Sequence, residues 1–315
     1  MGVRYVTARV KRKKLTGWRI KQQLQWYSFI VPSIICLIVL TYIPTIKSIQ
    51  YSFYKVASIG LDKKYVGLKN YASILKHTQF HQALANTGIL AALSLLVIPL
   101  GFILATLVNE LGRTKKQTFF RIGFYIPNIL TGVSVVLLFQ FVLRQHDGLL
   151  NTFLGALAGR PVEIGWLVDA RVTKISVTIM GIWGGLGYNM LINLAGLQSI
   201  PMELYEAAAI DGCSGIQRWR YIVIPNMTKT FSFLMITNII GSFSRFTDLF
   251  MLAGNSASGK PGGSLQTIMM YIYQYSFESP NYGISTAGCM VLFVLVFAVT
   301  MIELAITGFF RKEEA

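Results

Sequence analysis

Six apolar segments, each about 20 residues long, constrain the fold of this chain more than any other feature. They lie near residues 27–46, 87–108, 122–143, 174–197, 230–252 and 284–309. A helix needs about 20 residues, at roughly 1.5 Å each, to cross about 30 Å of hydrocarbon. The sequence is 53% hydrophobic and 13% charged, which leaves too few charges to cover a soluble protein of 315 residues. We therefore predict an all-α integral membrane protein with six transmembrane helices.

Basic residues indicate on which side of the membrane the chain begins. Residues 1–25 form an arm in which eight Lys or Arg stand between Arg4 and Lys21. An excess of this kind marks cytoplasmic segments, and six spans then return the tail at 311–315 to the same side. The predicted transmembrane domain is residues 26–310, with both termini in the cytoplasm.

The basic residues of the loops agree with this topology in part. The loop at 109–121, predicted inside, carries four basic residues, whereas the loop at 47–84, predicted outside, carries six lysines: Lys47, Lys55, Lys63, Lys64, Lys69 and Lys76. The formal net charge of +16 does not indicate nucleic acid, because retention of positive segments inside the cell explains the basic arm better. We expect the arm to lie against anionic membrane lipid.

The most specific pattern stands between the fourth and fifth apolar segments. It reads Glu206-Ala207-Ala208-Ala209-Ile210-Asp211-Gly212, followed by Ile222-Val223-Ile224-Pro225. Alanine and glutamate favour a helix, while glycine ends one and lets the backbone turn. The stretch therefore predicts a short surface helix, a tight turn at Gly212, and a second short helix that ends near Pro225.

This arrangement resembles the cytoplasmic loop of ABC importer permeases, whose pattern is E-A-A, three residues, G, nine residues, I-x-L-P. Ile224 departs from it by replacing leucine. The stretch Val66-Gly67-Leu68-Lys69-Asn70-Tyr71 is similar to one that often follows the first span in sugar permeases. Together with the apolar segments, the resemblance covers nearly the whole chain. It points to binding-protein-dependent sugar importers of the maltose-transporter type.

The resemblance implies a permease subunit in a bacterial cell membrane that works with a second, similar permease, two ATPase subunits and an external solute-binding protein. The cargo would be a carbohydrate, an oligosaccharide in particular, and Arg245 together with the basic outer loops would suit an acidic one. Residues 198–229 would form a coupling loop for the ATPase, through Glu206, Ala207, Ala208, Asp211, Gly212 and Pro225. The permease itself would be no enzyme and would hold no cofactor, since ATP and Mg belong to the partner ATPase.

Polar residues inside the fourth and fifth segments are the candidate substrate pathway. Asn238, Ser242 and Arg245 follow i, i+4, i+7 spacing and would share one helix face, with Asp248 beside it. Arg245 and Asp248 could equally form a structural ion pair, and Gly181 with Gly185 could serve close helix packing. In sugar permeases these two spans line the path, which selects Tyr188, Asn189, Asn238, Ser242, Arg245 and Asp248.

The sequence gives little support for a nucleotide site, a metal site, disulfides or catalysis in this chain. The run from Gly254 to Lys260 matches the opening of a P-loop, but Pro261 stands where a Ser or Thr should bind magnesium, which favours a flexible loop. No cluster of His, Cys, Asp and Glu has metal-ligand spacing, and three widely spaced cysteines indicate no disulfide framework. We assign no catalytic residue.

Two other functions remain open. An ion-coupled secondary transporter of a small polar solute would need carboxylates inside the membrane, for which Asp248 and Glu303 are the evident candidates. A membrane partner in signalling would transport nothing, and its polar helix face would be structural. Uptake measurements distinguish all three functions.

Overall fold

The computed structural model describes residues 17–56, 63–112 and 114–307. Their regular structure is helical apart from two short antiparallel strands, β1 (Tyr54–Lys55) and β2 (Lys64–Tyr65). The chain divides into two units, residues 1–50 and 51–315. The first 16 residues of the basic arm and the tail at 311–315 lie outside the described residues.

The first unit is one helical stretch. It consists of α1 (Gly17–Leu37), a π-helical turn η1 (Ile38–Tyr42) and α2 (Ile43–Ser52), which runs into the second unit. Residues Gln25–Ser52 are apolar and long enough to cross a membrane. The prediction of an apolar span near 27–46 is confirmed.

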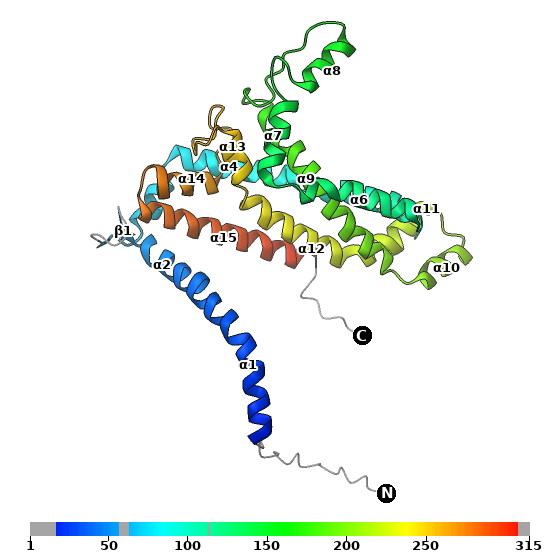
Figure 1. The fold of residues 1–315 in the computed structure, drawn as a ribbon, viewed down its shortest axis with the longest axis horizontal. Coiled ribbons are helices and arrows are strands. Elements are labelled where there is room, and N and C mark those ends of the chain that lie inside the picture. The colour runs from blue at the N-terminus through cyan, green and yellow to red at the C-terminus, as the bar shows by residue number, and fades with distance from the viewer. Residues whose placement is uncertain (1–16, 57–62, 113, 308–315) are drawn as a thin grey trace. The chain divides into compact units, whose positions relative to one another are not determined.

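The second unit holds the remaining helices (Figure 1). In chain order they are α3 (Lys69–Ile74), α4 (Thr78–Ser94), α5 (Val97–Glu110), α6 (Lys115–Ile129), α7 (Gly132–Val142), α8 (Leu149–Ala158), α9 (Thr173–Gln198), α10 (Met202–Ile210), α11 (Gly215–Arg218), the π-helical turn η2 (Trp219–Val223), α12 (Ile224–Phe243), α13 (Thr247–Leu252), α14 (Ile268–Tyr273), the π-helical turn η3 (Gln274–Glu278) and α15 (Tyr282–Ile306).

Within the described residues, four apolar helical stretches have the length to cross a membrane, or five if α6 and α7 count together as one span. The four are Gln25–Ser52, Thr78–Glu110, Thr173–Gln198 and Tyr282–Ile306. The chain is therefore a mainly helical, multi-pass membrane protein.

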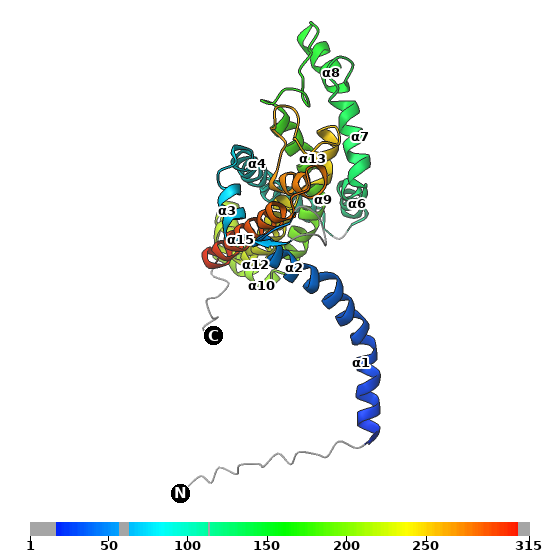
Figure 2. The ribbon, with the colours of Figure 1, turned by 90° about the vertical axis from the view of Figure 1, so that its left-hand side faces the viewer.

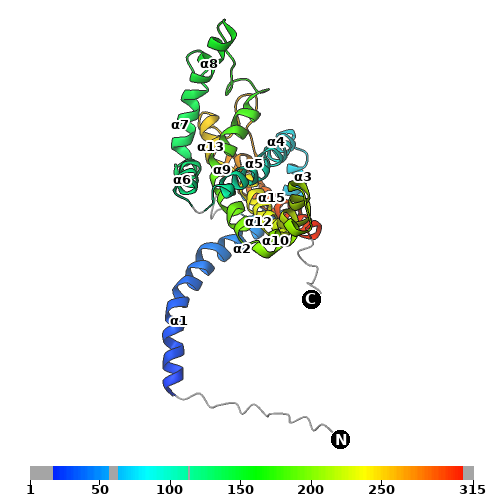
Figure 3. The same ribbon diagram turned by 90° about the vertical axis from the view of Figure 1, so that its right-hand side faces the viewer.

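Two of the predicted spans are wrong as single helices. The segment at 122–143 breaks after Ile129, and α7 turns away from α6 by 95° (Figure 3). The break follows from Thr131, which is extended and accepts a hydrogen bond from the backbone N–H of Ser134, so that it caps a new helix. The segment at 230–252 breaks at residues 244–246, between α12 and α13.

Each π-helical turn in the described part of the chain stands just before a proline. The residue before each proline donates its backbone N–H to the carbonyl five residues back: Ile43 to Ile38, Ile224 to Trp219, and Ser279 to Gln274. Proline has no N–H, and its ring clashes with the carbonyl four residues back. The wider π-helical turn relieves that clash. Pro225 therefore does not end a helix as predicted, because α11, η2 and α12 run on as one continuous helix.

Helix α9 is central to the packing of the second unit, since it lies against α5, α6 and α12. A Cβ placed on Gly187 would lie 2.1 Å from the carbonyl oxygen of Phe124 in α6, and one on Gly101 would lie 2.8 Å from Cβ of Asn189. Only glycine fits such approaches. The tightest approach along α9 is thus at Gly187, and Gly181 and Gly185, the alternative weighed from the sequence, make looser contacts.

Helix α12 also lies against α4 and α15, the second of which runs beside it in Figure 2. They share an apolar core with α14, in which Phe80 and Tyr271 are nearly fully buried and their rings meet edge to face. The Gly-rich loop after α13 packs in a neighbouring apolar cluster, through Ala253, Ala257 and Leu265. Asn86 donates to the carbonyls of Gly263 and Gln266, at 2.8 and 2.9 Å. The loop predicted over 253–283 is irregular only up to residue 267, because α14 and η3 follow, and hydrogen bonds from α4 hold its irregular part.

Candidate functional site

The coupling loop contains the predicted helix and turn. Glu206, Ala207 and Ala208 lie on α10, and Asp211 caps its end. Gly212 follows with φ of +70°, the left-handed region that glycine enters at least cost. Cys213 donates its backbone N–H to the carbonyl of Ala208 at 2.9 Å, and Gly212 donates to Ala209 at 3.2 Å. These two bonds form a Schellman motif, so the turn satisfies the last carbonyls of α10.

A capping box that our sequence analysis missed begins the second helix. The Ser214 hydroxyl accepts from the backbone N–H of Gln217 at 3.3 Å, and the Gln217 side chain accepts from the N–H of Ser214 at 2.7 Å. A Ser followed three residues later by Gln is the signal that would have revealed it. The turn is thus specified from both ends by local residues.

One face of α10 is anchored and the other is exposed. Ala208 is buried, and Tyr205 packs against the cluster that includes Val223 and Met227. Burial raises the pKa of the Tyr205 hydroxyl, which the positive charge of Arg218 partly opposes. Glu206, Ala207 and Asp211 are exposed.

Two large apolar side chains of the same loop are also exposed, and sequence reasoning missed both. Ile210 is 87% exposed and Ile216 is 83% exposed, one on each side of the Gly212 turn. Large exposed apolar side chains that form a contiguous patch mark interaction sites. The signal of these two in the sequence was a branched apolar residue on each side of Gly212.

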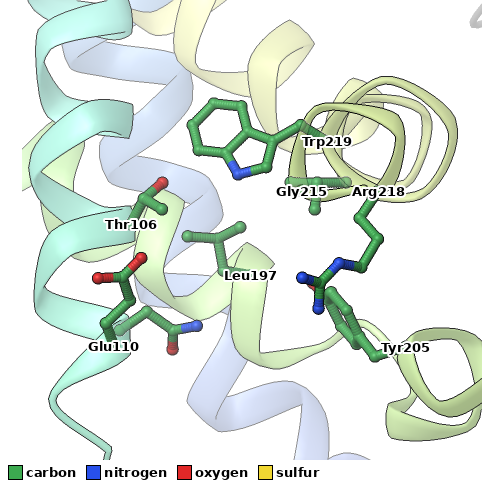
Figure 4. A pocket seen from close by; sticks show the side chains of 9 residues that line it. Thr106, Glu110, Leu197, Tyr205, Gly215, Arg218 and Trp219 are labelled. Atoms are coloured by element: carbon green, nitrogen blue, oxygen red, sulfur yellow. The ribbon is translucent and has the colours of Figure 1, made fainter. Parts of the chain in front are cut away.

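A cleft separates the coupling loop from the end of α5 (Figure 4). Arg218 lies beside Tyr205 on one side, while Glu110 and Thr106 come from α5 on the other. This cleft has a volume of about 350 Å³, and a neighbouring one of about 550 Å³ shares Asn109, Leu197, Tyr205 and Arg218 with it. Tyr205, Arg218 and Trp219 form the side of the cleft that the loop contributes.

Four of the predicted pathway residues, two on α9 and two on α12, lie at contacts between helices. Asn238 donates to the side-chain oxygen of Asn189 at 3.0 Å and to the carbonyl of Leu234 at 2.8 Å. Ser242 donates to the carbonyl of Asn238 and contacts the hydroxyl of Ser94 on α4. Asn189 is 1% exposed, and Tyr188 is half-buried in an apolar cluster. Asn189 and Asn238 thus serve the packing of these helices.

Arg245 does not continue the helix face of Asn238 and Ser242 as predicted, because α12 ends at Phe243. Instead it lies in the break before α13. Its Nε and Nη2 donate to Oδ2 of Asp248, at 2.7 and 2.6 Å, and Nη2 also donates to the carbonyl of Val177 on α9 at 2.8 Å. The predicted ion pair between Arg245 and Asp248 is present.

A pocket of about 350 Å³ lies where the two helix breaks meet. Residues from the break between α6 and α7, from α9, and from the break between α12 and α13 line it: Pro127, Asn128, Leu130, Gly132, Val135, Met180, Gly181, Gly184, Arg245, Phe246, Thr247 and Asp248. Irregular backbone at membrane depth is tolerated where it is buried in protein or lines a cavity. Binding sites in transporters often form at such discontinuous helices.

The remaining titratable groups lie elsewhere. Glu303 is 4% exposed on α15, beside Ser232 of α12, and does not line this pocket. Cys36, Cys213 and Cys289 are free thiols. Among the described residues, no group of three or more His, Cys, Asp or Glu is placed to hold a metal ion.

A protein family and individual transport permeases both match this chain. A family described as "binding-protein-dependent transport system inner membrane component" matches residues 97–307. The chain is 31% identical to the arabinooligosaccharides transport system permease protein AraP of Halalkalibacterium halodurans, over 96% of this chain and 93% of AraP. It is 30% identical to the probable ABC transporter permease protein YurN of Bacillus subtilis, over 91% of this chain and 97% of YurN.

A solved structure has the same fold. It belongs to a bacterial ABC transporter involved in the import of the acidic polysaccharide alginate. The TM-score is 0.78 at 22% identity, over 94% of this chain and 99% of that one.

Proposed function

This chain belongs to the family of binding-protein-dependent transport system inner membrane components, and from that premise we propose that it is the permease subunit of an ATP-driven importer for a carbohydrate. An oligosaccharide suits the names of its relatives, one of which transports arabinooligosaccharides. An extracellular binding protein would deliver the sugar to the outer loops. ATP and Mg would be held by a partner ATPase, so this subunit would carry out no covalent chemistry.

The exposed face of the coupling loop is the observation that carries this proposal. Along the chain, the exposed Glu206 and Ala207 stand between the anchoring Tyr205 and two exposed isoleucines, Ile210 and Ile216. A helix whose side chains are small can enter a cleft on another protein, and burial of the apolar side chains that flank it is favourable. We assign this face to the ATPase.

The continuous helix from Gly215 to Phe243 supplies the mechanical path. It joins the coupling loop to Asn238, which is hydrogen-bonded to α9, and ends at the break that lines the pocket. Closure of two ATPase subunits on ATP would move the loop, and this helix would carry the movement to the pocket. The cavity would then change from inward to outward access, and hydrolysis would reset it.

The proposed topology has six spans in a bacterial cell membrane, with both termini in the cytoplasm. The bent pair of α6 and α7 would serve as the third span, and α12 with α13 as the fifth. A second, different permease would complete the transport path. Two ATPase subunits would bind on the cytoplasmic side. The coupling loop would then face the ATPases.

An ion-coupled transporter is less compatible with the pocket. Asp248, one of its two candidate carboxylates, already accepts two hydrogen bonds from Arg245. An ion-loading carboxylate has to release its partner in each cycle, at the cost of leaving a charge unpaired in a poorly solvated place.

Purification from the native membrane tests the proposed function. We expect an ATPase and a second permease to co-purify with the tagged chain in mild detergent, both identified by mass spectrometry. No nucleic acid should co-purify. Glu206→Lys should abolish recovery of the ATPase, because the added charge occupies the docking face. Glu163→Lys makes the same charge change in the loop after α8 and serves as the matched control. Reproducible recovery of the chain alone would contradict the proposal.

A further inference from the structure

The pocket at the two helix breaks contains one positive and one negative side chain. Of its lining residues within the described chain, Arg245 and Asp248 are the charged ones, so their formal charges of +1 and −1 cancel. Their side chains are 15% and 21% exposed, which places the pair at the pocket wall rather than in open solvent. A solute in this pocket therefore meets no net charge.

The pair leaves specific atoms available for hydrogen bonding. Nε and Nη2 of Arg245 and Oδ2 of Asp248 are engaged with each other, and Nη2 also reaches Val177. Among the described residues, Nη1 of Arg245 and Oδ1 of Asp248 have no protein partner, and neither is a fully buried atom. The pocket thus offers a donor and an acceptor on adjacent groups.

Gly181 makes room for the guanidinium beside α9. A Cβ on Gly181 would lie 3.2 Å from Nη1 of Arg245, closer than ordinary contact between such atoms. Asn128, whose side chain donates to the carbonyl of Gly184 at 3.3 Å, adds a polar group to the lining of the pocket.

We propose that this pocket selects a neutral saccharide and rejects an acidic one, with Arg245 and Asp248 as the residues that determine this specificity. The inference rests on the proposed import of a carbohydrate. Neighbouring sugar hydroxyls match the pair, since one accepts from Nη1 and the other donates to Oδ1. A uronate carboxylate would either approach the Asp248 carboxylate or displace it from Arg245, and both are unfavourable in a poorly solvated site. The acidic cargo that Arg245 suggested in the sequence is thereby disfavoured.

Direct binding to the intact permease–ATPase complex tests this selection without the preference of the binding protein. The probes are neutral hexose trisaccharides and their uronate counterparts, which differ in having a carboxylate in place of each CH₂OH group. We expect the wild-type complex to bind a neutral trisaccharide at least roughly tenfold more tightly than its uronate counterpart. Asp248→Asn leaves Arg245 uncompensated and should shift this ratio toward the uronate by roughly tenfold.

Two further variants separate charge from damage to the fold. Arg245→Gln should shift the ratio in the opposite direction, because Asp248 then repels the uronate. The double variant with both substitutions is neutral again and should return the ratio to near the wild-type value. Asp147→Asn is the matched control, because Asp147 forms an Arg–Asp pair of the same i, i+3 spacing with Arg144 on an exposed turn. It should leave the ratio unchanged.

The outcomes distinguish this inference from the proposed function. Equal or tighter binding of uronates by the wild type, or shifts in the same direction for both single variants, would overturn the selection by charge. A complex that contains its ATPases but neither binds nor imports any saccharide of either class would instead overturn carbohydrate import itself.

Discussion

Gly212 is the residue on which the turn of the coupling loop depends. Its φ of +70° is a conformation that other residues enter at a cost of about 1–2 kcal/mol. The sequence predicted this turn correctly, because a glycine after an alanine-rich helix has one common structural use. Local chemistry of this kind is readable without tertiary information.

Gly212→Val is expected to weaken ATP hydrolysis that depends on the transported solute. Valine disfavours the left-handed conformation, so α10 and α11 would lose their fixed angle and the docking face its shape. ATPase activity of the reconstituted complex measures the effect, which we expect to be several-fold. Gly215→Ala changes a glycine three residues later that has no positive φ and open space around its Cβ. Equal losses for both variants would show that the turn conformation is not the cause.

Arg245 shows where residue-level prediction failed. Its spacing from Asn238 and Ser242 fits one helix face only if the helix continues, and α12 stops at Phe243. Periodicity assumes an unbroken backbone and carries no signal for the break. The ion pair with Asp248 was predictable because it needs only proximity along the chain.

At the scale of elements, apolar content located helices better than it located their ends. Hydropathy reports which residues avoid water and is the same whether a segment is one straight helix or two bent ones. The 95° bend between α6 and α7 depends on Thr131 as a cap, and residues of the exposed break line a pocket together with residues of α9 and α13. The packing that tolerates such a break is not contained in either segment alone.

The crossing of α6 and α9 gives a prediction at this scale. Gly187→Ala would place a methyl group against the carbonyl of Phe124, an overpacking that typically costs about 1–3 kcal/mol. We expect the purified complex to lose several degrees of thermal stability, as followed by a fluorescence melting assay. The control is Gly123→Ala on α6, next to Phe124, where nothing lies within 4 Å of the added Cβ. A melting temperature for Gly187→Ala as high as that of the control would contradict the close packing.

At the scale of the whole molecule, the proposed importer and an ion-coupled transporter differ in what drives uptake, which is ATP in the first and an ion gradient in the second. Asp248 is engaged by Arg245, and Glu303 lies outside the pocket. The described chain thus places no second carboxylate in the pocket for a coupling ion.

Uptake into cells should therefore depend on ATP rather than on an ion gradient. A protonophore, added while the ATP level is maintained, is expected to leave initial uptake of the sugar within about twofold, whereas depletion of ATP at a constant membrane potential should abolish it. Radiolabelled solute and a parallel luciferase assay for ATP measure both quantities. Uptake that follows the gradient and not the ATP level would favour the ion-coupled alternative.

The helix that begins at Gly215 ends at Phe243, and the chain is irregular before α13 begins. In the proposed importer this helix would deliver the displacement, while Arg245 and Asp248 beyond its end would select the solute. Substitutions at 244–248 would then alter the accepted solute without a change to the surface that binds the ATPase. Substrate specificity and coupling to the ATPase would then evolve independently within the same chain.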